Sequence, residues 1–422
     1  MKKNMKIVAA LVSIGLISPM AYATNGDVMM AIGSQNTALG GTGVANYAGA
    51  ESTWANPAMI GLSKGSEVTG GILLFQPKVT NTGFNPAAAG AKSKSDQFLI
   101  PDVSYSSRMS DSLSYGVAFA GIAGMGVDYS SEPTNVAGKS ALSLAKLLAT
   151  IAYNTNDYGV GFSPVMQYGS LALSYKSGTN PAVNGAGDAN TSVGYGFNLG
   201  GYYNVMPSLV VAAVYESEIA AKYGTQISKA GNGFGLCLPT GPTCPGAPFG
   251  DDLNQPAQMK LGVAYTMSNI TLTADYKQIK WGEAAGYKDF GWENQNILAV
   301  GAKYAGNGYW VGLGYNSTKD PIAAQPTAGN GSMYRNSAIN FFNNLFFPAV
   351  VENSFTFGGG YDISESFDIE AAAVITPEVT KKVSISDIPA TYDGGGNPLT
   401  FHTTNTTTHS QQSLSLSLRY KF

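Results

Sequence analysis

Charge, cysteine, histidine and long apolar runs are all scarce in this 422-residue chain. Charged residues make up only 12% of it, which is low for a protein whose whole surface faces water. The net charge of −3 gives no reason to expect a nucleic acid or an anionic surface as a partner. After residue 23, no stretch approaches the roughly 20 apolar residues of a membrane-spanning helix, so the sequence does not indicate an inner-membrane protein.

Residues for catalysis or metal binding are equally scarce. The two histidines, His402 and His409, lie in Thr-rich sequence, and neither a nucleophile elbow nor a Walker loop is present. The two cysteines, Cys237 and Cys244, bound the short run CLPTGPTC and are expected to form a disulfide in an oxidising compartment. A zinc site would need more ligands than this run offers. The sequence therefore predicts no enzyme, no cofactor and no metal site.

The first 23 residues have the layout of a secretory signal peptide. Its parts are a basic region, an apolar run and a small-x-small motif: Lys2, Lys3 and Lys6; Ile7–Ile17; and Ala21-Tyr22-Ala23. The alternative, a transmembrane helix, is disfavoured because the apolar run is too short to cross about 30 Å of hydrocarbon. We expect the mature chain to begin at Thr24.

Segments of period-two alternation follow one another from Glu67 to the end of the chain. In the last one, Leu414, Leu416 and Leu418 alternate with serines, and the segment ends on the terminal Phe422. One face is apolar and the other small or polar, which is typical of strands with lipid outside and a polar interior. A secreted β-sandwich is the alternative, with the apolar face as core, but the connections argue against it.

The connections alternate between short turns and long polar segments. Six short turns are expected near Met109–Ser112, Asn154–Asp157, Val205–Ser208, Met267–Asn269, Ala305–Gly308 and Ser364–Ser366, with seven long loops at 80–98, 127–142, 176–192, 216–257, 282–295, 316–352 and 377–412. This pattern predicts fourteen antiparallel strands with tyrosines near the short turns, as in a bacterial outer-membrane barrel. The barrel must close, because an open edge in lipid would leave backbone groups unpaired.

The segment Thr24–Lys64 differs from everything that follows it. It is rich in Gly, Ala, Asn and Ser and has neither strand alternation nor a long amphipathic helix. We interpret this plug segment as a plug inside the barrel. The expected organisation is a signal peptide at 1–23, a hatch at 24–66 and the barrel at 67–422.

The plug segment and the strands together resemble the FadL/TodX family of outer-membrane channels for long-chain fatty acids and other hydrophobic compounds. The plug part of the resemblance is LGGTGVANYAGAESTWANPAMIGLSKGSEVTGGI, with Asn56, Pro57 and Ala58 as the Asn-Pro-Ala of the family. Further stretches run from Leu148 to Tyr175, Pro256 to Trp281 and Phe290 to Ile322. The resemblance implies a fourteen-stranded barrel closed by an N-terminal hatch, capture from outside, and lateral exit through a defect in the third strand.

Two regions are candidates for parts of that route. The third strand alternates only as far as Phe119, and the next residues include Gly121, Gly124 and Gly126. Glycine inside a strand marks a bulge or kink, so these glycines indicate either a lateral opening or simple barrel curvature. The loop 316–352 carries Phe341, Phe342, Phe346 and Phe347, which form either an apolar capture site or the packing of the loop itself.

Three functions remain open from the sequence. The first is an uptake channel for hydrophobic small molecules, with long-chain fatty acids as the main expectation and aromatic hydrocarbons as the alternative. The second is a general diffusion porin, and the third is a structural or adhesion barrel. For the first, the expected surroundings are outer-membrane lipid and lipopolysaccharide, the barrel-assembly machinery during biogenesis, and no oligomeric partner.

Overall fold

The period-two segments form long strands that make up the wall of a barrel. The computed structural model describes residues 24–87, 89–176, 188–233, 249–392 and 398–422. The wall strands are β3 (Ser66–Asn81), β5 (Phe98–Arg108), β6 (Leu113–Asp128), β7 (Lys139–Asn154), β8 (Tyr158–Ser174), β9 (Asn190–Met206), β10 (Leu209–Glu216), β11 (Gln258–Met267), β12 (Ile270–Ile279), β13 (Gln295–Ala305), β14 (Tyr309–Thr318), β15 (Asn353–Ser364), β16 (Phe367–Ser384) and β19 (Thr404–Lys421).

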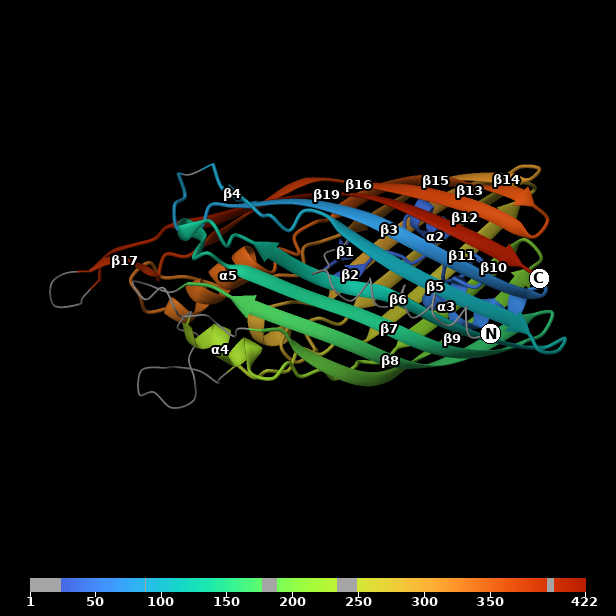
Figure 1. The fold of residues 1–422 in the computed structure, drawn as a ribbon, viewed down its shortest axis with the longest axis horizontal. Coiled ribbons are helices and arrows are strands. Elements are labelled where there is room, and N and C mark those ends of the chain that lie inside the picture. Colours follow the sequence, from blue (N-terminus) through green and yellow to red (C-terminus); the bar gives the residue numbers. More distant parts are fainter. Residues whose placement is uncertain (1–23, 88, 177–187, 234–248, 393–397) are drawn as a thin grey trace.

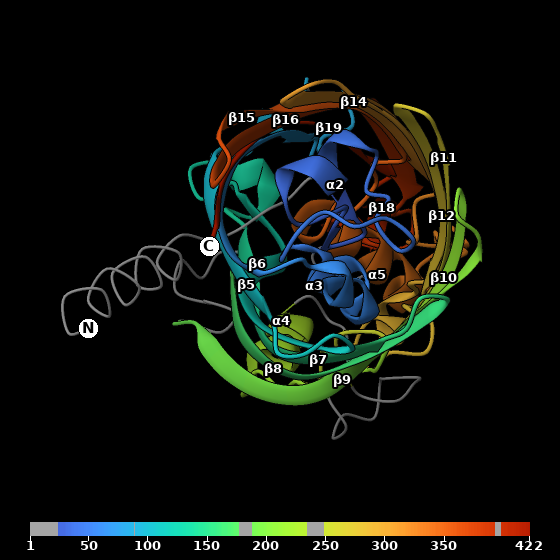
Figure 2. The same ribbon diagram turned by 90° about the vertical axis from the view of Figure 1, so that its right-hand side faces the viewer.

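Each wall strand pairs antiparallel with the next, and the last strand, β19, pairs with the first, β3. The partners Leu414↔Leu74 and Tyr420↔Val68 lie in this closing ladder. This ladder joins the first and last strands, so their backbone groups are hydrogen-bonded to each other and not left unpaired in lipid. The predicted fourteen-stranded antiparallel barrel is confirmed (Figures 1 and 2).

Side-chain exposure follows the alternation that the sequence predicts. In β19, Leu414, Leu416 and Leu418 are exposed on the outer face, whereas Ser413, Ser415 and Ser417 are buried inside. The six predicted short turns join the wall strands at one end of the barrel. Eight tyrosines near that end are exposed: Tyr115, Tyr153, Tyr158, Tyr203, Tyr265, Tyr304, Tyr309 and Tyr361. Their apolar rings and polar tips suit the membrane–water interface.

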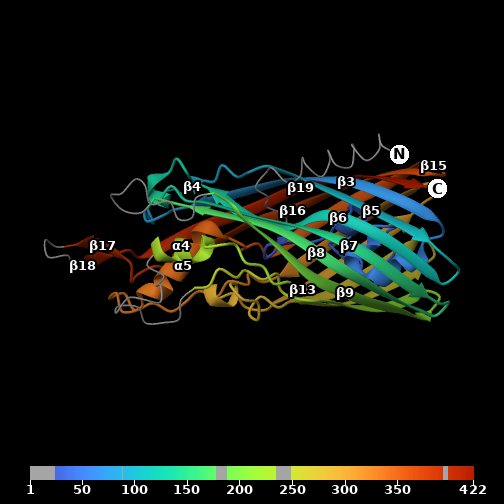
Figure 3. The same ribbon diagram turned by 60° about the horizontal axis from the view of Figure 1, so that its bottom comes forward.

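The long connections gather at the opposite end and contain structure of their own (Figures 1 and 3). They carry the helices α4 (Gln226–Gly233) and α5 (Tyr334–Phe346), the 3₁₀ turns η2 (Pro133–Asn135) and η3 (Lys288–Phe290), and the short strands β4 (Ala91–Lys92), β17 (Pro389–Tyr392) and β18 (Pro398–Phe401). Across the described ranges, the helices are all too short or too polar to cross a bilayer. The largest apolar cluster packs between these loops, with α5 at its centre.

The plug segment lies inside the ring of strands, seen from the short-turn end in Figure 2. It contains β1 (Thr24–Asn25), β2 (Val28–Met29), α2 (Ser34–Ala38), α3 (Ser52–Ala55) and η1 (Pro57–Leu62). Hydrogen bonds hold it to the wall: Ser34 Oγ to Ser417 Oγ at 2.8 Å, Thr42 Oγ1 to Thr273 Oγ1 at 2.7 Å, Thr53 Oγ1 to Thr150 Oγ1 at 2.6 Å, and Gly43 N to Asp275 Oδ2 at 2.9 Å. A polar barrel interior thus binds a polar, small-residue segment.

Candidate functional site

The barrel wall is interrupted between β5 and β6. Their ladder runs from Arg108↔Ser114 to Asp102↔Ala120 and stops there, although β6 continues to Asp128. On its other side β6 stays paired with β7 throughout, with a register shift between Gly121 and Ala123. The alternation of exposed and buried residues also ends at Phe119. The half of β6 from Gly121 to Asp128 therefore lacks a wall neighbour on the β5 side.

Gly121, Gly124 and Gly126 all lie in this half of β6, which has a wall neighbour in β7 but none on the β5 side. The place of the missing neighbour is taken by β2 of the plug segment, where Val28 pairs with Ala123. The main-chain N–H of Gly124 donates a 2.9 Å hydrogen bond to the carbonyl oxygen of Asp27. The plug segment thus closes the gap with a strand of only two residues.

The edge of the gap is apolar. Met29 and Met30 pack against buried residues of β3 and β5, among them Phe75, Phe98 and Ile100. The rings of Phe75 and Phe98 are stacked with their centroids 6.3 Å apart. An apolar molecule at this position would meet hydrocarbon side chains on both sides once the plug segment moved.

A second feature is an apolar pocket among the external loops. It is lined by Met125, Leu142, Leu171, Leu173, Ile227, Leu253, Tyr287, Phe290, Trp292, Phe342, Asn343 and Phe347. Its free volume is only ≈ 20 Å³, which is about the room of one water molecule. A larger ligand can enter only when some of these side chains move.

The four phenylalanines of the predicted capture site divide between this pocket and the loop core. Phe342 and Phe347 line the pocket, and Phe342 stacks on Phe290 with centroids 5.0 Å apart. Phe341 instead packs on Phe84 at 4.3 Å, and Phe346 packs on Tyr175 at 6.0 Å. Phe341 and Phe346 thus contact other loop residues, and the three phenylalanines of α5 (Phe341, Phe342 and Phe346) are almost completely buried. The capture site stays a prediction.

Met125 of β6 connects the pocket with the gap. It lines the apolar pocket and also a small cavity beside the gap, which is bounded by Gly124, Gly126, Phe75 and Val79. Its side chain is 7% exposed and is the shared boundary of the two spaces. A flexible methionine at this point can change rotamer at low cost.

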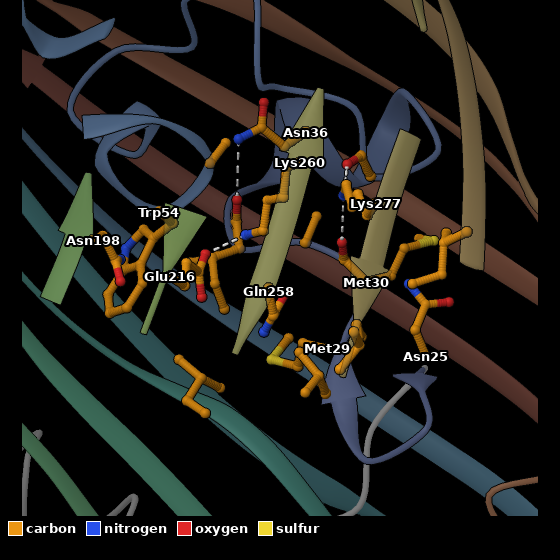
Figure 4. Close-up of a pocket in the computed structure, with 18 of the residues that line it drawn as sticks. Asn25, Met29, Met30, Asn36, Trp54, Asn198, Glu216, Gln258, Lys260 and Lys277 are labelled. Atoms are coloured by element: carbon orange, nitrogen blue, oxygen red, sulfur yellow. Dashed lines mark hydrogen bonds and ion pairs between the residues drawn. The ribbon is translucent and has the colours of Figure 1, made fainter. Parts of the chain in front are cut away.

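The plug segment and the wall line a second cavity, of ≈ 80 Å³, in which apolar residues alternate with buried charged and amide side chains; it is called the polar cavity after the latter. Figure 4 shows Lys260 and Glu216 directed toward one another from β11 and β10. Lys146 Nζ lies 3.9 Å from Glu216 Oε2, and Lys277 donates to the carbonyl of Gly41 in the plug segment. The amide groups of Gln255 are buried without a hydrogen-bond partner among the described residues, so the cavity has capacity for water.

The Asn-Pro-Ala sequence (Asn56, Pro57 and Ala58) stabilises the local structure of the plug segment. The Asn56 side chain accepts from the N–H of Ala58 at 3.0 Å and donates to the carbonyl of Val44 at 2.8 Å. This caps η1 and ties two parts of the plug segment together. The wall comes very close here, since a Cβ added at Gly200 would lie 2.1 Å from Asn56 Oδ1.

The cysteine pair and the histidines were the other groups considered for chemistry. Cys237 and Cys244 lie outside the described residues. His409 is buried in β19, where Nδ1 is 2.8 Å from the carbonyl of Pro348. Within the described parts of the chain, no group of three or more His, Cys, Asp or Glu side chains is placed to hold a metal ion.

A comparison with protein families matches residues 20–422 to the family described as outer membrane protein transport protein (OMPP1/FadL/TodX). The chain belongs to the FadL/TodX family. The family consists of transport channels, so this FadL/TodX protein is a channel for hydrophobic compounds in the outer membrane of a Gram-negative bacterium and not an enzyme. A comparison with curated proteins gave no match.

Solved structures with the same fold are distant in sequence. A FadL homologue from Pseudomonas aeruginosa has 14% identity and a TM-score of 0.67, over 94% of this chain and 100% of that one. The toluene transporter TodX of Pseudomonas putida has 18% identity and a TM-score of 0.63, over 94% and 100%. The toluene transporter TbuX of Ralstonia pickettii has 16% identity and a TM-score of 0.60, over 93% and 99%. At these identities the similarity establishes the shared fold.

Several residues of this FadL/TodX channel escaped the reading of the sequence. Asp27, Tyr287 and Lys277 are buried polar groups whose partners are more than 200 residues away in the chain. Met125 stands in the run Ala120–Gly126, in which only the glycines had been assigned a role. A charged residue at the start of a Gly/Ala-rich segment, such as Asp27, was the one available signal.

Proposed function

We propose that this channel moves hydrophobic molecules from the outside into the outer membrane through its wall. The external loops capture the molecule in the apolar pocket, the start of the plug segment shifts, and the molecule leaves between β5 and β6. The observation that carries the proposal is the adjacency of pocket and gap across Met125, where the two-residue strand β2 takes the place of the missing wall neighbour in the described structure. A general diffusion porin would need an open lumen, whereas here the plug segment occupies it.

The moving part in this proposal is short. Residues from Ser34 to Asn56 are bonded to β19, β12, β7 and β9 around the wall. By contrast, Thr24–Ile32 is held by the bridge at Val28, by Asp27 and by a 3.5 Å contact of Lys277 with the carbonyl of Met30. A shift of this first part opens the gap without lifting the rest of the plug segment from the barrel.

Long-chain fatty acids are the first substrate class that we propose. The polar cavity contains three lysines, Lys146, Lys260 and Lys277, against one glutamate, Glu216. A carboxylate is the anion that lysine ammonium groups bind well at a partly desolvated site. The acyl chain would lie along the apolar gap edge formed by Met29, Phe98 and Ile100, next to that cavity.

Aromatic hydrocarbons are the second candidate class. The pocket lining is almost without polar groups, and beside aliphatic residues it includes the aromatic side chains of Tyr287, Phe290, Trp292, Phe342 and Phe347 around a small space. A compact neutral ring would pack against such faces and edges without needing a charged partner. Solved structures of similar fold include the toluene transporters TbuX and TodX.

The experiment is an uptake assay in a bacterial strain that lacks other channels for these compounds. Cells with this protein, cells with a Gly124→Trp variant and cells with an empty vector receive labelled oleate or labelled toluene. We expect protein-dependent uptake that the substitution abolishes, while heat-modifiable gel migration shows that the barrel is folded. Uptake of neither compound above the empty vector would overturn the proposal, and the ratio of the two rates assigns the class.

The proposal includes the surroundings of the barrel. The loop end faces lipopolysaccharide, the apolar outer wall contacts membrane lipid, and the terminal Phe422 strand serves as the signal for the barrel-assembly machinery. The route lies within one chain, so a monomer is sufficient for transport.

A further inference from the structure

Asp27 lies where the pocket, the gap and the plug segment meet. Its carbonyl oxygen accepts the 2.9 Å hydrogen bond from Gly124, in the half of β6 that has no neighbour on the β5 side. Its side-chain Oδ2 accepts a hydrogen bond from the hydroxyl of Tyr287, in the loop between β12 and β13. One residue of the plug segment is therefore bonded to the edge of the gap and to the wall of the apolar pocket.

Tyr287 belongs to a group of three aromatic rings. Its ring centroid is 4.6 Å from that of Trp281 and 4.9 Å from that of Trp292. Tyr287 and Trp292 also line the apolar pocket. Gly26, beside Asp27, lies against the same group, since a Cβ there would be 2.6 Å from Trp281 Cζ2. The start of the plug segment is thus packed on the back of the pocket wall.

The bonding of Asp27 is incomplete. Its side chain is completely buried, yet Oδ1 has no hydrogen-bond partner in the described structure, and neither does the amide of Gln255. Burial is the main cause that raises the pKa of Asp27 to about 6, while Tyr287, the nearby side chain of Gln255 and the charge of Lys146 lower it. A buried carboxylate with an unfilled acceptor is costly, and the hydrogen bond from Tyr287 offsets part of that cost.

We propose that Asp27 couples occupancy of the apolar pocket to opening of the gap, with Tyr287 as the element that a ligand moves. The inference rests on the proposed function and assigns the trigger of its middle step. The free space of ≈ 20 Å³ forces an entering molecule to displace lining side chains. Displacement of the Tyr287 ring removes the hydroxyl from Asp27 and leaves a buried charge without a donor. The residue then moves toward water, and its carbonyl releases Gly124.

The test measures hydrogen exchange at the gap in the purified full-length channel. Peptides that contain the Gly124 amide report whether its bond to Asp27 is made. We expect Tyr287→Phe to accelerate exchange of this amide by about 10- to 100-fold, as expected for the loss of a hydrogen bond to a charged group. Toluene or oleate added to the wild type should accelerate it in the same direction.

Two variants serve as controls. Tyr129→Phe also removes a buried hydroxyl, but that hydroxyl has no hydrogen-bond partner in the described structure, and it should leave the Gly124 amide unchanged. Asp27→Asn keeps an acceptor for Tyr287 and adds an N–H donor, for which the side-chain oxygen of Gln255 can be the acceptor. Exchange of the Gly124 amide in this variant should therefore equal or fall below that in the wild type.

The outcomes separate this inference from the proposed function. Wild-type uptake of oleate or toluene, together with equal exchange at Gly124 in wild type and Tyr287→Phe, would overturn the coupling and leave the channel function intact. Absence of uptake would overturn the function itself. Fast exchange in Asp27→Asn equal to that in Tyr287→Phe would also contradict the coupling, because the acceptor is retained there.

Discussion

Arg419 of β19 and Glu51 of the plug segment face each other inside the barrel, with Nη2 and Oε2 3.6 Å apart and both side chains buried. Arg419 also lies 3.1 Å from Glu370 and 3.9 Å from Asp368. One cation therefore serves several carboxylates at the junction of plug segment and wall. Burial raises the pKa of Glu51 well above its usual value, and the neighbouring Asp102 and Glu370 raise it further.

Substitutions of Arg419 and of Glu51 are expected to change the stability of the folded barrel by different amounts. Arg419→Met removes the ion-pair partner of the buried Glu370 and Glu51, which costs about 3–5 kcal/mol, whereas Asp368 keeps its contact with Lys421. Glu51→Gln removes a carboxylate whose raised pKa stabilises the folded state only at low pH, so at pH 7 its effect should be close to zero or stabilising. The temperature at which gel migration shifts to the unfolded form measures both. Equal losses in the two variants would contradict this description.

The contact of the plug segment with β9 predicts a leak. Gly200→Ala places a Cβ 2.1 Å from Asn56 Oδ1 and 2.7 Å from Pro57 Cδ, so Asn56 and Pro57 must move away from the wall. We expect a folded barrel with raised ion conductance in planar bilayers, and deletion of Thr24–Ala55 gives the conductance of the open lumen. The matched control is Gly70→Ala, which meets no atom within 4 Å. Identical conductance in both alanine variants would argue against a plug.

The surroundings of Asp27 predict a pH dependence of uptake. Its pKa rises from 3.8 to about 6 in the docked position, so docking is stabilised below about pH 4 and this stabilisation is lost as the pH rises through 6. The span corresponds to about 3 kcal/mol. The groups that face it are Tyr287, Tyr223 and Lys146. Uptake should therefore rise severalfold between pH 5.5 and 7.5, and Asp27→Asn should remove that rise. An unchanged pH profile in the variant would contradict the assignment.

The route past Met125 predicts a block by bulk at that point. Met125→Trp fills the boundary between the apolar pocket and the cavity beside the gap, and we expect uptake of toluene and oleate to fall at least about tenfold. The control is Met259→Trp, because Met259 is 51% exposed on the outer wall and aromatic residues are tolerated there. Transport by the Met125 variant at the control rate would mean that the molecule takes another path.

The wall of the barrel could be predicted because the residue alternation within each strand indicates which of its faces points outward. The alternation from Leu414 to Leu418 fixes which side chains face lipid, and a short turn between two such segments fixes their pairing. The plug segment could be recognised by composition alone. These are local signals, and they survive in a single sequence.

The parts that could not be predicted depend on contacts across the fold. The hydrogen bond between Asp27 and Tyr287 joins residues 260 positions apart, and no periodic pattern in the sequence predicts it. Arg419 is one of several inward polar residues in its strand, and only the folded barrel shows which carboxylates it meets. The helix α5 contains NFFNNLF, which has weak intrinsic helix preference, so its structure follows from burial among the loops.

The central claim is that the gap between β5 and β6 must open for transport, and a reversible crosslink tests it most directly. Val28 of the plug segment pairs with Ala123 at the β6 edge of the gap, at a spacing that suits a disulfide. Val28→Cys with Ala123→Cys should therefore lock the plug segment in the gap when Cys237 and Cys244 are replaced by Ser. The control pair is Ser66→Cys with Ser107→Cys, in strands that already pair. We predict that uptake of oleate or toluene by the oxidised Val28/Ala123 protein is abolished and returns on reduction, while the control pair transports in both states. Undiminished uptake by the oxidised, fully crosslinked protein would contradict the account.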